Sequence, residues 1–329
     1  MKNIGFTPVI VILFVFLAGF LFFSSCNQNG VKRNNPDKGA ISISGAFALY
    51  PLTVLWAEEF NKSYPDIRVD ISAGGAGKGM ADVLAGMVDL AMFSRDVLPA
   101  ETERGAWSVA VAKDAVVPVV NSANPFIEVL MKHGLNKDML ETLYTSEMVT
   151  RWSEICPGIS QESKVHNYTR SDACGAAQVW AKYLNSNQEQ LQGIGVFGDP
   201  GMAEAVKKDV LGLGYNNMAY MYDIDSRAIR PGLAVIPIDL NKNGVIDDDE
   251  RFYGSLDSLL RAIQRGAYPA PPARDLFFIS NGTPKNEQVR TFLNWVLTHG
   301  QQYISRAGYV NLSEEQITEQ KQKLHNESH

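Results

Sequence analysis

The stretch that decides the fold is residues 41–79, ISISGAFALYPLTVLWAEEFNKSYPDIRVDISAGGAGKG. Ile41 to Ser44 alternates apolar and polar residues like a strand and ends at a glycine. Pro51 stands where the first turn of a helix tolerates proline, and apolar residues follow it at helical spacing. Ile67 to Ile71 is the next strand-like run, and a glycine-rich turn at 74–79 closes it. This order of strand, helix and strand predicts an α/β fold with mainly parallel pairing.

The same alternation continues along the chain, interrupted by a middle part of helices and polar turns up to about residue 225. Further strand-like runs lie at 89–93, 115–120, 233–238 and 276–280. The chain has 329 residues, which indicates two domains of ordinary size or one large domain. Its net charge of -6 comes from scattered charges, so we expect no nucleic-acid partner.

The first 25 residues have the features of a bacterial lipoprotein signal peptide. Lys2 precedes an apolar run from Val9 to Phe23, which is shorter than the roughly 20 residues that span a bilayer. Ser24 and Ser25 then lead into Cys26, which we expect to become the acylated first residue of the mature chain. Residues 26–40 are polar and predict a flexible tether. The alternatives are an ordinary signal peptide cut near Ser25 and a retained membrane anchor.

Eight segments, in the same order along the chain, resemble the phosphate-binding component of bacterial ABC importers, a branch of the periplasmic binding proteins. The resemblance covers residues 41 to about 312. The segments are Ser44–Pro51, the turn at 74–79, Val88–Arg95, Val111–Asp114 with Asn124-Pro125, Leu143–Trp152, Tyr168–Gly175, Leu211–Tyr215 and Gly308-Tyr309.

The resemblance implies a type II, two-lobed periplasmic binding protein fold, in which each lobe is a mainly parallel sheet flanked by helices. We expect the chain to cross between the lobes near 118–124 and near 228–238. Ser313 and Gln316 predict the capping box of a last short helix, and the polar tail after Glu319 is expected to fray. The expected domains are lobe one at 41–118 plus 239–312, lobe two at 119–238 and a C-terminal tail at 313–329.

Three turns between a strand and a helix, at 45–48, 75–79 and 173–176, are candidates for an oxyanion site. Backbone N–H groups at helix N-termini attract anions, and small residues allow close approach. The family has Ser and Thr hydroxyls in these turns, whereas this chain has alanines and a cysteine. The resemblance implies that the ligand is lined by Ala46, Phe47, Ala76, Gly77, Ser94, Arg95, Arg170, Cys174, Gly175 and Ala176.

Two arginines are the candidate cations of this site. Arg170 matches the arginine with which the family contacts its ligand, and Arg95 stands where some members have an aspartate. An arginine in place of that aspartate favours a fully ionised or larger anion, because its forked donors suit oxyanions. Lys78 either adds charge or is a solvated lysine near a helix start. Phosphate is the leading ligand, and related oxyanions stay open.

A second site is predicted at residues 239–250, DLNKNGVIDDDE, which fit the twelve-residue calcium loop at every constrained position. Gly244 would make the sharp turn and Ile246 would point into the core. A strand-like run precedes the loop and a helical pattern follows from Ser255, so we expect a structural calcium ion rather than a sensor. The predicted ligands are Asp239, Asn241, Asn243, Val245, Asp247 and Glu250.

We predict a monomeric binding protein, not an enzyme, which lies in the periplasm or at the cell surface and delivers its anion to an ABC permease. The alternative is a surface lipoprotein that senses an anion or adheres to a partner without transport. An enzyme with Cys174 as its nucleophile has a thiol near a helix start but no general base close in sequence. Cys156 and Cys174 are expected to be free thiols, although an exported protein permits a disulfide.

Overall fold

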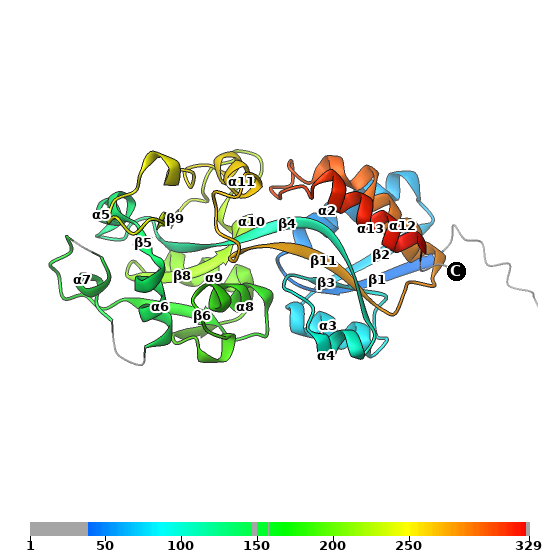
Figure 1. The fold of residues 1–329 in the computed structure, drawn as a ribbon, viewed down its shortest axis with the longest axis horizontal. Coiled ribbons are helices and arrows are strands. Elements are labelled where there is room, and N and C mark those ends of the chain that lie inside the picture. The colour runs from blue at the N-terminus through cyan, green and yellow to red at the C-terminus, as the bar shows by residue number, and fades with distance from the viewer. Residues whose placement is uncertain (1–38, 147–149, 157, 327–329) are drawn as a thin grey trace, which may run out of the picture. The chain divides into compact units, whose positions relative to one another are not determined.

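The computed structural model describes residues 39–146, 150–156 and 158–326, so the predicted signal peptide, Cys26 and nearly all of the tether lie outside the described residues. Strands and helices alternate along the described chain (Figure 1). The strands are β1 (Gly39–Gly45), β2 (Ile67–Ala73), β3 (Leu90–Phe93), β4 (Ala106–Asn121), β5 (Leu135–Asn136), β6 (His166–Arg170), β7 (Ile194–Val196), β8 (Gly212–Asn217), β9 (Leu233–Val235), β10 (Ile238–Asp239) and β11 (Ala273–Asn281). The helices are α2 (Tyr50–Ser63), α3 (Ala76–Leu84), α4 (Pro99–Glu103), α5 (Ile127–His133), α6 (Lys137–Thr145), α7 (Trp152–Ile155), α8 (Gly175–Tyr183), α9 (Gly198–Lys208), α10 (Met218–Met221), α11 (Leu256–Gln264), α12 (Glu287–Leu297) and α13 (Glu314–Asn326). Three short 3-10 helices are η1 (Gln188–Gln190), η2 (Asp248–Glu250) and η3 (His299–Tyr303).

Nine strands form a mixed sheet in the order β2-β1-β3-β11-β4-β8-β6-β7, with β9 beside β4. β1 is parallel to β2 and β3, and β6 is parallel to β7 and β8. Between these parallel parts, β4 and β11 pair antiparallel with each other. The predicted α/β fold is therefore confirmed. Parallel pairing holds within β1, β2 and β3 and within β6, β7 and β8, whereas β4, β9 and β11 form only antiparallel pairs.

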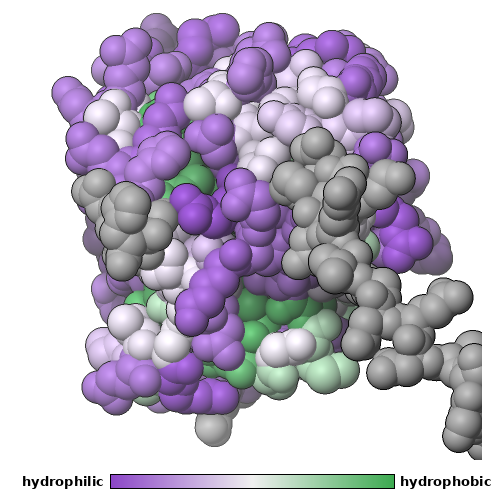
Figure 2. Space-filling view, turned by 90° about the vertical axis from the view of Figure 1, so that its right-hand side faces the viewer, coloured by the Kyte–Doolittle hydropathy of each residue, from purple (hydrophilic) through white to green (hydrophobic). Residues whose placement is uncertain are grey.

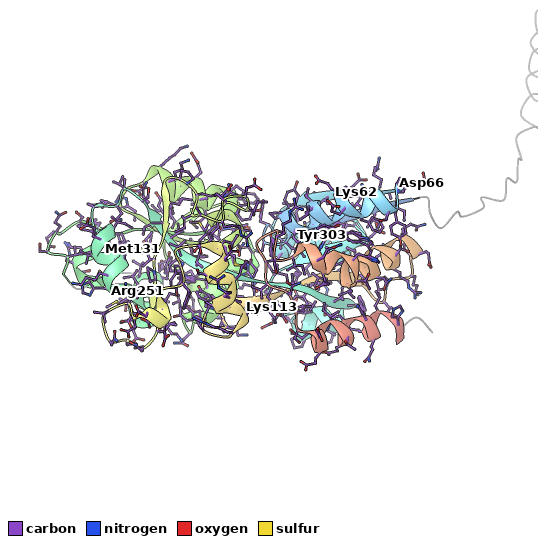
Figure 3. All side chains as sticks on the ribbon, turned by 90° about the horizontal axis from the view of Figure 1, so that it is seen from above. Lys62, Asp66, Lys113, Met131, Arg251 and Tyr303 are labelled. Atoms are coloured by element: carbon purple, nitrogen blue, oxygen red, sulfur yellow. The ribbon has the colours of Figure 1, made fainter. Side chains whose placement is uncertain are left out.

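The longest strand, β4, joins the two parallel parts of the sheet. Its first half pairs with β11, and its second half pairs with β8 and β9. Lys113, labelled in Figure 3, lies near the middle of β4, and its ammonium group is 2.5 Å from the Asp275 carboxylate of β11. The sequence predicted only residues 115–120 of this strand, because Ser108, Lys113 and Asp114 interrupt the apolar run before it.

Two hydrophobic cores flank this central pair of strands. One contains Trp56, Phe278 and Trp295, and the other contains Tyr144, Trp180 and Tyr268. The second core also takes in α11, through Leu256 and Leu259 among others. The structure thus differs from the predicted boundaries: residues from 239 to about 268 pack with the second lobe.

The reason for the difference lies in the apolar face of α11 and in the strand before the calcium loop. Leu256, Leu259 and Ile263 are buried in the second core. β10 pairs with β5, which belongs to the same part of the chain. The return to the first lobe therefore comes with β11, about 40 residues later than the crossing predicted near 228–238.

The C-terminal tail is a helix and not a frayed end, so that prediction is wrong. The predicted capping box forms, since Ser313 and Gln316 exchange hydrogen bonds at the start of α13. Leu324 is 2% exposed in the first core. Gln320 accepts a hydrogen bond from the Ala110 amide of β4, which ties the polar side of the helix to the sheet.

One face of the molecule is mostly polar. Figure 2 shows a face that is largely hydrophilic, with a hydrophobic area in its lower part. Met87, after α3, and Leu98, before α4, are 73% and 50% exposed. Within the described part of the chain, no helix has the length and hydropathy needed to cross a membrane.

Candidate anion-binding site

The three predicted turns come together at the ends of β1, β2 and β6. The amides of Gly74 and Gly75 in the second turn donate to the Gly45 carbonyl of the first, at 2.9 and 3.0 Å. The Gly77 amide donates to the Ala173 carbonyl of the third turn at 3.0 Å. Segments that lie about 100 residues apart in sequence thus form one polar cluster.

Several backbone amides in this cluster have no hydrogen-bond partner among the described residues. They belong to Phe47, to Ala76 at the first position of α3, and to Gly175 and Ala176 in the first turn of α8. Both helices have nine residues, so their aligned peptide dipoles add partial positive charge where these amides lie. Such donors suit an anion.

Ser94, at the end of β3, lies against the start of α8. A Cβ atom on Gly175 would be 2.3 Å from the Ser94 hydroxyl oxygen and 2.2 Å from its carbonyl oxygen. Only glycine fits here, and this close approach places the predicted Ser94 beside the third turn.

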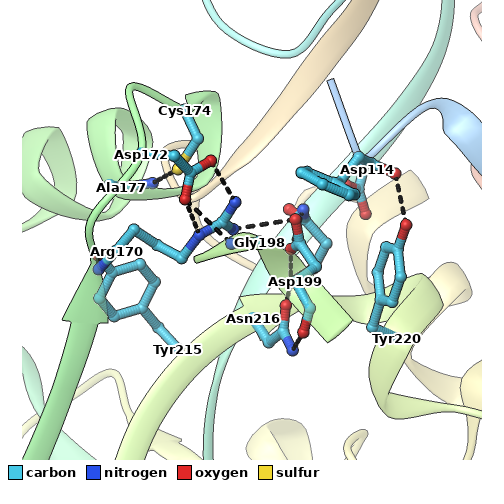
Figure 4. A network of polar contacts seen from close by, with 12 residues as sticks. Asp114, Arg170, Asp172, Cys174, Ala177, Gly198, Asp199, Tyr215, Asn216 and Tyr220 are labelled. Atoms are coloured by element: carbon cyan, nitrogen blue, oxygen red, sulfur yellow. Dashed lines mark hydrogen bonds and ion pairs between the residues drawn. The ribbon is translucent and has the colours of Figure 1, made fainter. Parts of the chain in front are cut away.

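Arg170, at the end of β6, is completely buried between two carboxylates (Figure 4). Its Nε and Nη2 donate to Asp172 at 2.8 and 2.7 Å, and its Nη1 donates to Asp199 at 2.9 Å. Burial acts to lower the pKa of the guanidinium, but the two carboxylates outweigh it and raise that pKa above its usual value. A guanidinium has five N–H groups, so one N–H on each terminal nitrogen has no part in these contacts. Both are buried in this structure, and an anion reaches them only when the surrounding side chains move.

Asp199 connects this arginine to the central strands. It accepts hydrogen bonds from the Asn217 amide and side chain, and Asn217 in turn accepts from Arg274 of β11. Arg274 also donates to Asp114 of β4 at 3.2 Å. Burial raises the pKa of Asp114 to about 6, although Arg274 opposes the shift.

Arg95 and Lys78 do not present free cations to this cluster. Both terminal nitrogens of Arg95 donate to Glu101, at 2.8 and 2.6 Å, and its guanidinium lies 4.4 Å from the centre of the Phe93 ring. The predicted contact of Arg95 with the ligand therefore competes with an existing ion pair. Lys78 pairs with Asp82, one turn along α3, and is half exposed, which fits the solvated lysine.

Cys156 and Cys174 are buried and form no disulfide with each other, as predicted. The Cys174 sulfur accepts a hydrogen bond from the Ala177 amide at the start of α8, at 3.4 Å. Burial nevertheless raises the pKa of this thiol to about 12, although Arg170 acts to lower it. The helix start does not produce the thiolate that a nucleophile requires.

The predicted calcium loop folds around its own acidic residues. Asp239 and Glu250 are 2% and 4% exposed. Glu250 accepts from the amides of Leu240 and Asp247 at 2.7 and 3.1 Å, and Asp239 accepts from Gly244 at 3.0 Å.

Two conformational expectations for this loop are confirmed: Gly244 has a φ of +82°, and Ile246 is buried. Asn241 and Asn243 turn their amide nitrogens toward Asp247, each at 2.8 Å. Across the described ranges, no three His, Cys, Asp or Glu side chains are grouped so that they could hold a metal by themselves. A calcium ion here would therefore need the asparagine oxygens and the Val245 carbonyl as well.

Sequence reasoning missed three residues around Arg170. Asp172 follows it by two positions, and this spacing of an arginine and an aspartate at the end of a strand was the available signal. Asp199 and Tyr220 come from α9 and α10, and only the fold brings them near Arg170. Tyr220 donates to the Phe47 carbonyl at 2.9 Å and packs against the first core, whereas Met218 and Met221 of the same helix are buried in the second core.

The N-termini of α3 and α8, one from each α/β lobe, lie near the buried Arg170. This arrangement defines a two-lobed binding protein. A family model described as "PBP superfamily domain" matches residues 30–299, so the chain belongs to this family. Among curated relatives, it is 25% identical to the phosphate-binding protein PstS of Bacillus subtilis over 224 residues, which cover 65% of this chain and 72% of that protein. It is 22% identical to the phosphate-binding protein PstS of Methanocaldococcus jannaschii, covering 87% of this chain and 86% of the relative.

Solved structures agree on the fold. A putative phosphate ABC transporter substrate-binding protein from Clostridium perfringens, solved with bound phosphate, has a TM-score of 0.68 at 18% identity, covering 84% of this chain and 100% of that one. An ABC-type phosphate transport receptor from Vibrio cholerae has a TM-score of 0.59, also at 18% identity, covering 83% and 100%. These identities are low, so the structural likeness supports the two-lobed fold alone.

Proposed function

We propose that this protein binds a small oxyanion, with phosphate as the leading ligand, and delivers it to an ABC permease. The observation that carries the proposal is the buried Arg170 beside free amides at the starts of α3 and α8. Curated relatives across most of the chain are phosphate-binding proteins. They are binding proteins rather than enzymes, and the high pKa of the Cys174 thiol supports the same role here.

In this proposal each group has a part in binding. The two remaining N–H groups of Arg170 are a fork that fits two oxygens of a tetrahedral anion. The amides of Ala76, Gly175 and Ala176 would donate to the other oxygens. Asp172 and Asp199 hold the guanidinium in place, so little conformational entropy is lost when the anion binds.

Isothermal titration calorimetry of the mature protein with phosphate, and separately with sulfate, tests this proposal. We expect saturable binding of phosphate, and Arg170→Gln should weaken it by at least 100-fold, because a charged donor pair is lost. A second variant avoids disturbing the two aspartates. Ala76→Pro removes one N–H at the first position of a helix, where proline is tolerated, and should weaken binding by about tenfold.

Ala76→Ser is the matched control at the same position. It keeps the N–H and restores a hydroxyl of the kind that the family has there, so it should bind phosphate at least as tightly as the natural protein. If calorimetry detects no heat of binding with phosphate, with sulfate or with an organic phosphate, the proposal is refuted.

We also propose that Cys26 anchors the mature protein to a membrane, in the periplasm or at the cell surface. The sequence before Cys26 supports this, since an apolar run and two serines precede the cysteine. Mass spectrometry of the mature N-terminus should find lipid on Cys26. Release of the Cys26→Ser variant into the soluble fraction is the second expected result, and an unmodified Cys26 on the exported protein would contradict it.

The calcium loop is proposed as a structural site. Its support is the full sequence pattern, the inward-facing Asp239 and Glu250, and the left-handed turn at Gly244. Calcium in 100-fold excess over its dissociation constant should stabilise the fold by about 2.7 kcal/mol. Thermal melting with calcium or with EGTA measures this, and Glu250→Gln is expected to remove the difference. Equal melting temperatures for the natural protein in both buffers would end the proposal.

A further inference from the structure

An apolar pocket adjoins the anion-binding site. It has a volume of about 620 Å³, which is within the usual range for small-molecule sites. Both lobes contribute to its walls, which include Phe47, Tyr50, Pro51 and Val54 from the first turn and α2, and Pro200 and Tyr220 from α9 and α10. We call these six residues the mouth pocket.

Phe47 is the wall that the mouth pocket shares with the anion-binding site. Its ring centre lies 6.0 Å from the guanidinium carbon of Arg170, and its carbonyl accepts the Tyr220 hydroxyl. The ring also makes an edge-on contact with Phe197 at 5.9 Å, and Phe197 is 61% exposed. Apolar surface thus continues from the buried arginine to solvent.

The anion-binding site lacks the hydroxyl donors that the resemblance implies. Ala46, Ala76 and Ala176 stand where the resemblance implies hydroxyl groups, and alanine donates only through its backbone. Inorganic phosphate has four oxygens that need donors or water, and an oxygen buried without a donor is costly. A phosphate or phosphonate that carries one organic substituent exposes only three free oxygens.

We propose that the preferred ligand is a tetrahedral oxyanion with one apolar substituent, whose charged end lies on Arg170 and whose substituent fills the mouth pocket. This rests on the proposed oxyanion binding and specifies its ligand class. The substituent leaves fewer oxygens to satisfy, and its apolar surface is removed from water between Phe47, Val54 and Tyr220. A flat aromatic ring matches these walls.

Calorimetry with phenyl phosphate and methyl phosphate tests the proposal on the mature protein. The two probes share the charged end and differ in the ring. We expect phenyl phosphate to bind at least tenfold more tightly than methyl phosphate. Val54→Gln, which makes one pocket wall polar, should reduce this ratio to less than threefold, and Val69→Gln on β2, whose residue does not line the mouth pocket, should keep it.

The outcomes separate this proposal from the proposed function. If phosphate or methyl phosphate binds as tightly as phenyl phosphate, the apolar substituent is refuted and oxyanion binding stands. If none of the three anions binds, oxyanion binding itself is refuted. A third outcome is that phenyl phosphate and methyl phosphate bind equally tightly and Val54→Gln lowers phosphate uptake by cells. The mouth pocket then contacts a protein partner, and the proposal is overturned.

Discussion

Replacing Asp199 with alanine should destabilise the protein by about 3 kcal/mol. Asp199 is 1% exposed and accepts hydrogen bonds from Arg170 and from the Asn217 backbone and side chain. Removing one partner of a buried ion pair typically costs about 3–5 kcal/mol. The low end applies here, because Arg170 keeps both of its contacts with Asp172.

Urea denaturation followed by circular dichroism measures this loss. With a slope of about 3 kcal/mol per molar urea, the midpoint should fall by about 1 M. Glu204→Ala is the matched control, since Glu204 lies on the same helix and pairs with Lys208 at the surface. An Asp199→Ala midpoint as high as that of Glu204→Ala would refute the claim that a buried charge network holds Arg170 in place.

Two further predictions concern stability. The raised pKa of Asp114 favours the protonated acid in the folded protein. The stability that this shift contributes is complete below pH 3.8, the ordinary pKa of the group, and is lost as the pH rises through the raised pKa of about 6. Between pH 4 and pH 7, Asp114→Asn should therefore gain up to about 3 kcal/mol over the natural protein in urea denaturation, and a pH-independent difference would contradict this. Leu324→Ala should cost about 2–5 kcal/mol, because it opens a cavity under α13. Gln322→Ala, at an exposed position of the same helix, should leave the urea midpoint unchanged. If Leu324→Ala also leaves the midpoint unchanged, α13 does not pack against the first core.

The sequence predicted the elements whose signal is local. The strands β1 and β2, the helix that Pro51 opens and the glycine turn of α3 all lie where periodicity and turn residues placed them. The resemblance predicted the two-lobed fold, because its segments follow one another in order from one end of the chain to the other. These features depend on residues that are close in sequence, so a single sequence is sufficient to predict them.

The misjudged features depend on contacts between distant segments. The polar sequence of α13 predicted a frayed end. In the structure, the buried Leu324 and the hydrogen bond between Gln320 and β4 hold this helix against the sheet. The calcium loop was assigned to the wrong lobe because the pairing of β10 with β5 has no local signature.

The same limit applies to the site. Arg170 is recognisable from its segment, whereas Asp199, which fixes it, comes from another helix. The sequence predicted Arg95 as a cation of the site, and only the structure shows its ion pair with Glu101. Charges near a binding site therefore have to be judged together with their partners.

The most direct test of the account is to locate an anion in a crystal of the mature protein. Arsenate has the shape and charge of phosphate, and its arsenic atom gives an anomalous signal. We expect one strong peak within 4 Å of a terminal nitrogen of Arg170 and near the amides of Gly175 and Ala176. A peak at another place, or saturating arsenate without any peak beside Arg170, would contradict it.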